Sequence, residues 1–246
     1  MTSDPRPRRV RVALTIIRPA ARTRRPRTLR IAALVAALLL LTGLPVDAVS
    51  VVTRGSSAHR WVALTFDDGW SVGNCERIAA SFRARGARAT FLINGVNLDA
   101  SPGRWRRLLR GMPVASHGYT HLDMTKLSTA GVISQVQRER WAFQRVLGRP
   151  GLSMLRPPYG AYDSHVLAAA RSAGVARIVL WSVDTKDWVP GTSASTIYRR
   201  AIGAGSGGIV LMHCGPDATA SAVPSIIRWY QARGYQLVGL GQLLNG

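Results

Sequence analysis

Short apolar runs alternate with helix-like patterns from about residue 58 to the end of the chain. The runs are rich in Val, Ile and Leu, as parallel strands covered by helices on both faces are. The expected strands are Trp61–Phe66, Thr90–Ile93, Pro113–Ser116, Met154–Arg156, Arg177–Trp181, Gly208–Met212 and Tyr235–Val238. The expected helices are Asn74–Arg85, Pro102–Arg110, Ser128–Leu147, Asp163–Ala173, Ser193–Ala204 and Ala222–Arg233. This alternation predicts one parallel α/β domain, either a barrel or an open doubly wound sheet.

The N-terminal part differs in composition from the rest. Ten arginines lie in the first 30 residues, and the apolar run Ile31–Leu44 follows them. This run is shorter than the roughly 20 residues of a membrane span. Together with the small residue Ala48 it is typical of a secretory signal peptide, with an uncleaved N-terminal anchor as the alternative. We assign residues 1–48 to this leader, 49–58 to a linker and 59–246 to the folded domain, and expect a secreted or cell-envelope protein.

The chain stays strongly basic without its leader. After residue 48 it has 23 Lys and Arg against 10 Asp and Glu. Such a charge can be an ordinary solvated surface, or it can attract an anionic partner such as an acidic cell wall or a membrane surface. Nucleic acid is not expected as a partner, because the sequence has no helix-turn-helix or zinc-finger pattern and we expect the protein to be exported.

Titratable residues gather where the expected strands end, which is where parallel α/β domains place their functional groups. The segments at these ends are "DDG" (67–69), "HGYTH" (117–121), "RPPYG" (156–160), "DTKDW" (184–188) and His213. They contain three of the five histidines and four of the twelve carboxylates, so we expect one shared site.

His117 and His121 have a spacing that suits a divalent metal, although this spacing alone is a weak signal. One carboxylate from a neighbouring strand end would complete a site that leaves positions open for water and substrate, as catalytic metal sites do. Of the adjacent Asp67 and Asp68, one would then bind the metal and the other would take a proton from metal-bound water. The alternative is a plain Asp-Asp-Gly turn.

Five segments together resemble the motifs of the polysaccharide deacetylase family. They are "TFDDG", "HGYTH", "RPPYG", "DTKDW" and "IVLMH", and they match in order and spacing over roughly residues 59–244. The family is carbohydrate esterase family four, with the NodB homology domain; it includes chitin and peptidoglycan deacetylases and acetylxylan esterases. The resemblance implies a distorted (β/α) barrel, usually of seven parallel strands with peripheral helices, that holds one divalent metal, commonly zinc.

The resemblance also implies roles for single residues. Asp68, His117 and His121 would bind the metal. Asp67 would be the general base, and Arg156 would orient it through a charged pair.

The same resemblance implies the remaining parts of the site. His213 would be the general acid, with its pKa raised by Asp187, and the backbone N–H of Tyr159 would help to stabilise the oxyanion. Trp188 would line the substrate groove, and Trp70 is either a second sugar platform or core packing at the barrel rim. We assign four further tryptophans to packing, namely Trp61, Trp105, Trp141 and Trp229.

The resemblance implies a hydrolase that removes N-acetyl groups from a polysaccharide such as peptidoglycan or chitin oligomers. One alternative is an O-acetyl esterase that acts on xylan or another glycan with the same fold. Another is a non-catalytic, basic protein that binds the cell wall. The complete set of expected metal-binding and proton-transfer residues favours catalysis.

Two further features are a departure from the second motif and a pair of cysteines near the first and last motifs. Gly118 stands where the family has Ser or Thr, so the resemblance implies that this chain lacks the hydroxyl that would help to fix the loop between the two histidines. Cys75 follows the first motif and Cys214 follows His213, so in a closing barrel a disulfide would join these two ends. The alternative is two buried thiols.

Overall fold

The computed structural model describes residues 49–246, so the leader and signal peptide assigned to residues 1–48 lie outside the described residues. The strands are β1 (Ser50–Val52), β2 (Trp61–Asp68), β3 (Thr90–Ile93), β4 (Met154–Leu155), β5 (Arg177–Val179), β6 (Val183–Asp184), β7 (Gly208–His213) and β8 (Gln236–Leu237). The α-helices are α2 (Val72–Arg83), α3 (Gly95–Ala100), α4 (Pro102–Leu108), α5 (Thr129–Leu147), α6 (Ser164–Ser172), α7 (Ala194–Ala201), α8 (Asp217–Ala232) and α9 (Leu240–Asn245). Two short 3-10 helices are η1 (Met124–Lys126) and η2 (Pro158–Gly160). No helix in this part of the chain has both the length and the apolar character of a membrane span.

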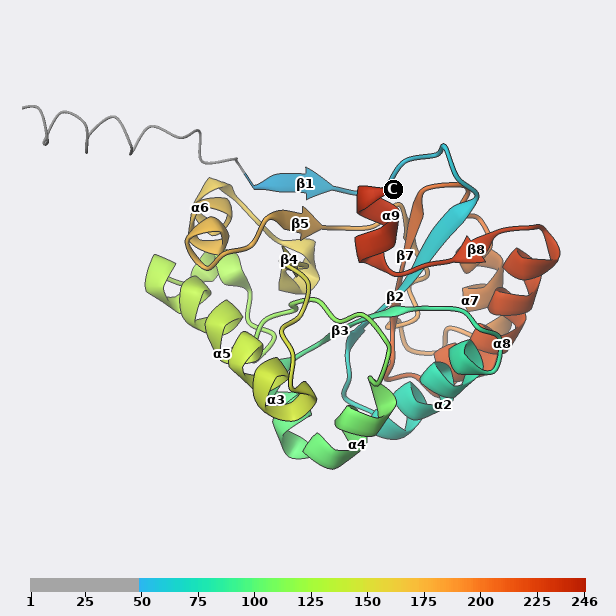
Figure 1. The fold of residues 1–246 in the computed structure, drawn as a ribbon, viewed down its shortest axis with the longest axis horizontal. Coiled ribbons are helices and arrows are strands. Elements are labelled where there is room, and N and C mark those ends of the chain that lie inside the picture. Colours follow the sequence, from blue (N-terminus) through green and yellow to red (C-terminus); the bar gives the residue numbers. More distant parts are fainter. Residues whose placement is uncertain (1–48) are drawn as a thin grey trace, which may run out of the picture. The chain divides into compact units, whose positions relative to one another are not determined.

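Strand β2 lies at the centre of the larger sheet (Figure 1). It pairs in parallel with β3 on one side and with β7 on the other, and its first two residues also pair with β8. Strand β6 extends the sheet beyond β7, which gives the order β3-β2-β7-β6. Seven of the eight β2 residues are buried, which explains why its first six residues, Trp61–Phe66, are mostly apolar.

A second, smaller sheet has the order β1-β5-β4, again with parallel pairing. The expected strand Pro113–Ser116 forms isolated bridges only, one from Val114 to Phe91 of β3 and one from Ser116 to Leu155 of β4. These bridges connect the two sheets on one side. The predicted parallel α/β fold is therefore confirmed. The hydrogen-bonded ladders between the described strands do not close into a complete barrel.

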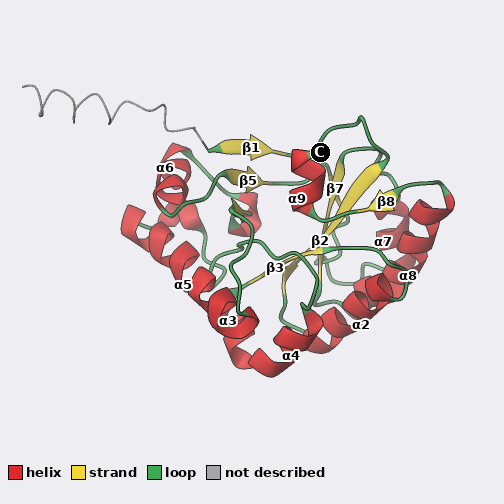
Figure 2. Cartoon of the chain, viewed as in Figure 1, coloured by secondary structure: helices red, strands yellow, loops and turns green. Residues whose placement is uncertain are grey.

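Helices cover the outside of both sheets (Figure 2). The main core lies between β2, β3 and β7 and the helices α2, α4 and α8, with Phe66, Phe82 and Ile226 fully buried in it. Packing is confirmed for Trp105, which is 1% exposed, but it is wrong for Trp141, which is 65% exposed. The buried positions of α5 are 132, 135, 136, 139, 142, 143 and 146, so residue 141 falls on the opposite side of the helix.

Several short elements differ from the sequence-based expectation. Residues 49–58, expected to be a linker, contribute β1, which pairs with β5 along its whole length. Strand β6 has only two residues, and α3 and α9 have six each. Segments of this length are too short to show a helical or strand periodicity in the sequence. Their conformation is therefore determined by tertiary contacts.

Candidate active site

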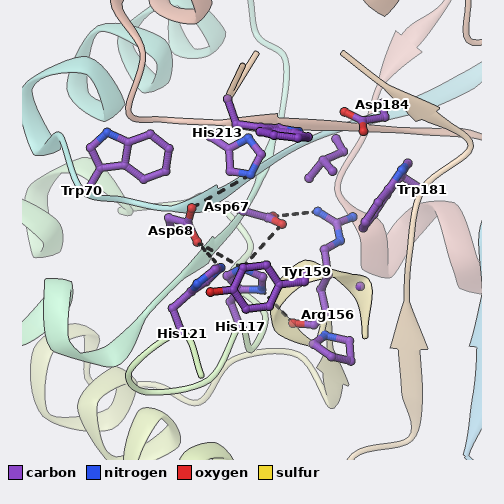
Figure 3. Close-up of a pocket in the computed structure, with 14 residues that line it drawn as sticks. Asp67, Asp68, Trp70, His117, His121, Arg156, Tyr159, Trp181, Asp184 and His213 are labelled. Carbon is purple, nitrogen blue, oxygen red and sulfur yellow. Dashed lines mark hydrogen bonds and ion pairs between the residues drawn. The ribbon is translucent and has the colours of Figure 1, made fainter. Parts of the chain in front are cut away.

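Asp67 and Asp68 are the last residues of β2, and both face the same cavity (Figure 3). Consecutive residues of an extended strand point to opposite faces of the sheet. Asp68 avoids this by adopting a positive φ of 67°, and Gly69 follows with a φ of 87°. A Cβ atom at Gly69 would also lie 2.8 Å from the ring of Trp105, so this turn needs glycine. The backbone thus turns both carboxylates into one site.

His117 and His121 bring two imidazole rings to Asp68. The Nε2 atoms of His117 and His121 lie 3.1 and 3.2 Å from Asp68 Oδ1. This oxygen is buried and has no hydrogen-bond partner among the described residues. The Nδ1 of His117 lies 2.7 Å from the carbonyl oxygen of Arg156. Since that carbonyl can only accept, the Nδ1 of His117 carries a proton and donates it, and Nε2 is directed at Asp68.

These three side chains fit a divalent metal ion. One ligand atom from each of Asp68, His117 and His121 lies within 4.8 Å of the others. Two imidazole nitrogens with one carboxylate oxygen are a donor set that zinc accepts, with a position left open for substrate or water. The otherwise unpartnered Asp68 Oδ1 is the atom that such an ion would satisfy.

The electrostatics of the site favour positive charge between the carboxylates and the imidazoles. Burial would raise the pKa of Asp68, but the nearby imidazoles of His117, His121 and His213 lower it overall. Burial would lower the pKa of His117, but the carboxylates of Asp67 and Asp68 raise it to about 9. Burial lowers the pKa of His121, against the attraction of Asp68.

Asp67 is held by a fully buried arginine, as the family resemblance implies. The Nη1 of Arg156 donates to Asp67 Oδ1 at 2.7 Å and to the hydroxyl of Thr65 at 2.9 Å. Its other nitrogens donate at 3.0 Å to the carbonyl oxygens of Val179 and Leu180. The guanidinium therefore has one orientation, and it fixes Asp67 with one oxygen, Oδ2, facing His117 Nε2 at 3.8 Å.

His213 approaches the site from the neighbouring strand end, because β7 pairs with β2 and places residue 213 opposite residue 67. Its Nδ1 lies 2.8 Å from Asp187 Oδ1, and its backbone N–H donates to Asp187 Oδ2 at 2.7 Å. Burial would lower the pKa of His213, but the hydrogen bond and charge of Asp187 raise it overall. The remaining Nε2 lies 4.0 Å from Asp68 Oδ2, inside the cavity.

Aromatic side chains form the walls of a cavity of about 590 Å³ above these groups. Trp70, Tyr159 and Trp188 line it and are 53, 69 and 55% exposed. The ring of Trp70 lies 5.7 Å from that of His213, so Trp70 belongs to the rim of the site. Tyr159 has a φ of 63° and is followed by Gly160 at 68°, and this turn sets the orientation of its backbone in the cavity.

The structure adds residues that sequence reasoning missed. Trp181 lines the cavity beside Arg156, whose guanidinium carbon lies 5.7 Å from its ring. Thr219 of α8 donates its hydroxyl to Asp187 Oδ2 at 2.6 Å. Asp184, which begins the expected segment 184–188, lines the cavity as well, and its carboxylate accepts the N–H of Lys186 at 2.7 Å, which shapes the loop.

The unpredicted helix α3 and Asn94, the residue before it, join the segments that carry Asp68 and His117. The side chain of Asn97 donates to the carbonyl of Asp68 at 2.9 Å. The side chain of Asn94 donates to the carbonyls of His117 and Gly118, both at 3.1 Å. No sequence motif marks these asparagines, because each acts only on backbone groups that the fold brings near.

The expected disulfide between Cys75 and Cys214 is present, with the two Cα atoms 4.8 Å apart. It links α2, which follows the first motif, to the residue after His213. The disulfide therefore joins the helix that follows Asp67 to the strand end that carries His213.

Comparison with known proteins shows relatives of the chain. The family model of polysaccharide deacetylases matches residues 54–178, which include Asp67, Asp68, His117, His121 and Arg156. The peptidoglycan-N-acetylglucosamine deacetylase PgdA of Listeria monocytogenes is 32% identical over 76% of this chain and 40% of its own length. A bifunctional xylanase/xylan deacetylase of Cellvibrio japonicus is 32% identical over 73% of this chain and 27% of its own length.

A solved structure supports the same relationship. The Bc1960 peptidoglycan N-acetylglucosamine deacetylase superposes with a TM-score of 0.74 at 28% identity, over 79% of this chain and 92% of that chain. The present chain spans less than half the length of the two curated relatives named above. On the family model and these identities, the chain belongs to the polysaccharide deacetylase family.

Proposed function

We propose that this protein is a metal-dependent hydrolase that removes N-acetyl groups from a polysaccharide such as peptidoglycan or chitin oligomers. The observation that carries the proposal is the arrangement around Asp68. Its buried, unpartnered Oδ1 faces two imidazole nitrogens, and Asp67 lies beside it in a fixed orientation. A structural Asp-Asp-Gly turn would have no need of the histidines or the buried arginine.

Asp68, His117 and His121 would hold the ion, which we propose is zinc. When bound, such an ion acts as a Lewis acid toward water and a carbonyl oxygen. Because His117 keeps its proton on Nδ1 through the Arg156 carbonyl, its Nε2 is available as a ligand without a change of tautomer.

The surrounding side chains supply the proton transfers of amide hydrolysis. Asp67, kept in place by Arg156, would accept the proton of the attacking water through its free Oδ2. The backbone N–H of Tyr159 would donate to the oxygen that becomes negative as the carbonyl is attacked. His213 would then donate the proton on Nε2 to the departing amine, since Asp187 holds the other ring nitrogen.

The cavity supports a sugar substrate. Trp70, Tyr159 and Trp188 present partly exposed rings along its walls, and aromatic faces of this kind pack against the apolar faces of sugars. The named relatives act on peptidoglycan and on xylan, which supports a polysaccharide as the substrate class.

The decisive experiment is acetate release from chitooligosaccharides and from peptidoglycan, before and after chelation. We expect release that stops on chelation and returns with zinc. No acetate from either substrate, with one zinc bound, would favour an O-acetyl ester substrate. No acetate and no bound zinc would favour the non-catalytic, wall-binding alternative.

The O-acetyl esterase remains the second candidate, because one relative is a xylan deacetylase. An alcohol leaves more readily than an amine, so ester cleavage depends less on a general acid. His213→Ala should therefore reduce amide cleavage far more than ester cleavage. Equal losses on both substrates would contradict the role proposed for His213.

We also propose that the protein works outside the reducing cytoplasm, either secreted or in the cell envelope. The Cys75–Cys214 disulfide supports this location, because such bonds persist in oxidising compartments. Cell fractionation with thiol labelling tests it. A cytosolic protein with both thiols reduced would refute the proposal.

A further inference from the structure

Helix α5 holds the loop that carries both proposed metal-binding histidines. Four consecutive backbone N–H groups, those of residues 117–120, donate to two side chains of this helix. The first two donate to the carboxylate of Glu139 at 2.8 and 3.1 Å. The next two donate to Oε1 of Gln135, both at 2.9 Å. Glu139 and Gln135 are four residues apart, so they lie on the same face of the helix.

Glu139 is a fully buried carboxylate whose two oxygens are both used by the loop. Oε1 accepts the N–H of His117, and Oε2 accepts the N–H of Gly118 and the hydroxyl of Ser116. A buried carboxylate is costly unless donors compensate it. Burial raises the pKa of Glu139 to about 8, and three donors oppose that rise; all three come from the segment that begins the metal-binding loop.

The loop has no side chain of its own at its second position. Gly118 has a φ of 82°, and a Cβ atom there would lie 2.9 Å from Cε of Met124. A serine or threonine at this position would be strained in the observed backbone. The loop therefore depends on groups outside it.

We propose that Glu139 is the positioning residue of this metal-binding loop and takes over the role of the hydroxyl side chain that Gly118 lacks. The inference rests on the proposed function, in which His117 and His121 hold the metal. Glu139 fixes the backbone of His117, and the carbonyl of Arg156 fixes its ring at Nδ1. Together they place Nε2 at 3.1 Å from Asp68 Oδ1.

The affinity for zinc tests this role directly. We would measure the zinc dissociation constant of the full chain by competition with a chromophoric chelator, for the wild type and for Glu139→Gln. The amide NH₂ of glutamine cannot accept an N–H, so one loop donor loses its acceptor. We expect the dissociation constant to rise about 10–100-fold, as it does when groups that orient a ligand are lost. Excess zinc should restore part of the activity.

Gln137→Ala is the matched control, because Gln137 is exposed on the same helix. Its zinc affinity should stay within about twofold of the wild type. Glu139→Asp is the second variant if Glu139→Gln folds poorly; it keeps the carboxyl group on a shorter arm and should weaken zinc binding less.

Two outcomes separate this inference from the proposed function. Unchanged zinc affinity in folded Glu139 variants, with only a lower melting temperature, would assign Glu139 to fold stability and overturn the inference alone. A wild-type protein that binds no zinc would overturn the proposed function and the inference with it.

Discussion

The two adjacent aspartates of β2 have different partners, so their replacement should have different effects. Asp68 faces two imidazoles, whereas Asp67 is paired with Arg156. We expect Asp68→Asn to lose bound zinc. Asp67→Asn should keep zinc and lower kcat by about 10²–10⁴-fold, the usual contribution of a general base. Metal content and acetate release measure both, and loss of zinc from both variants alike would contradict the division of roles.

The pH dependence of the rate should report on His213. A general acid must be protonated, so the rate falls as pH rises through its pKa. Asp187 raises that pKa, and Asp187→Asn should therefore move the alkaline limb of kcat/KM to lower pH. Asp184→Asn is the control, because Asp184 lines the same cavity but bonds the N–H of Lys186. An alkaline limb that stays in place in Asp187→Asn would argue against His213 as the acid.

At the scale of elements, the disulfide should contribute to stability by tying α2 to the end of β7. Its cysteines are 139 residues apart in sequence. Bonds that close long loops stabilise proteins by about 2–4 kcal/mol. Cys75→Ser combined with Cys214→Ser should lower the melting temperature by roughly 5–15 °C. Calorimetry measures this, and a reductant should lower the melting temperature of the wild type but not of the double variant.

The sequence predicted the elements that are long or that carry motifs. Strands β2, β3 and β7 and helix α5 appear close to their expected bounds, because each has a sustained apolar pattern. The histidines and aspartates of the site were found because these residue types are rare in the chain and fall at strand ends, while their individual roles came from the resemblance to polysaccharide deacetylases. Asn94, Asn97, Thr219 and Glu139 escaped detection, since they act on backbone groups or on another side chain and belong to no motif.

At the scale of the whole molecule, the excess positive charge should affect binding to charged polymers. Residues after 48 have 23 Lys and Arg against 10 Asp and Glu. Raising salt from about 0.05 to 0.5 M shortens the screening length several-fold, so the KM for anionic peptidoglycan should rise. The KM for neutral chitooligosaccharides should change little. An equal response of the two substrates would mean that the charge has no part in substrate capture.

The place of β2 between β3 and β7 has a consequence for biosynthesis. The ribosome makes β2 well before β7 and β8, yet both later strands pair with β2. A nascent chain that stops before residue 208 lacks a neighbour for one edge of β2 and lacks both Cys214 and His213. Native pairing of β2 must therefore wait until β7 and β8 have left the ribosome. Truncated products would expose the apolar edge of β2 to other chains, which makes them candidates for chaperones and proteases.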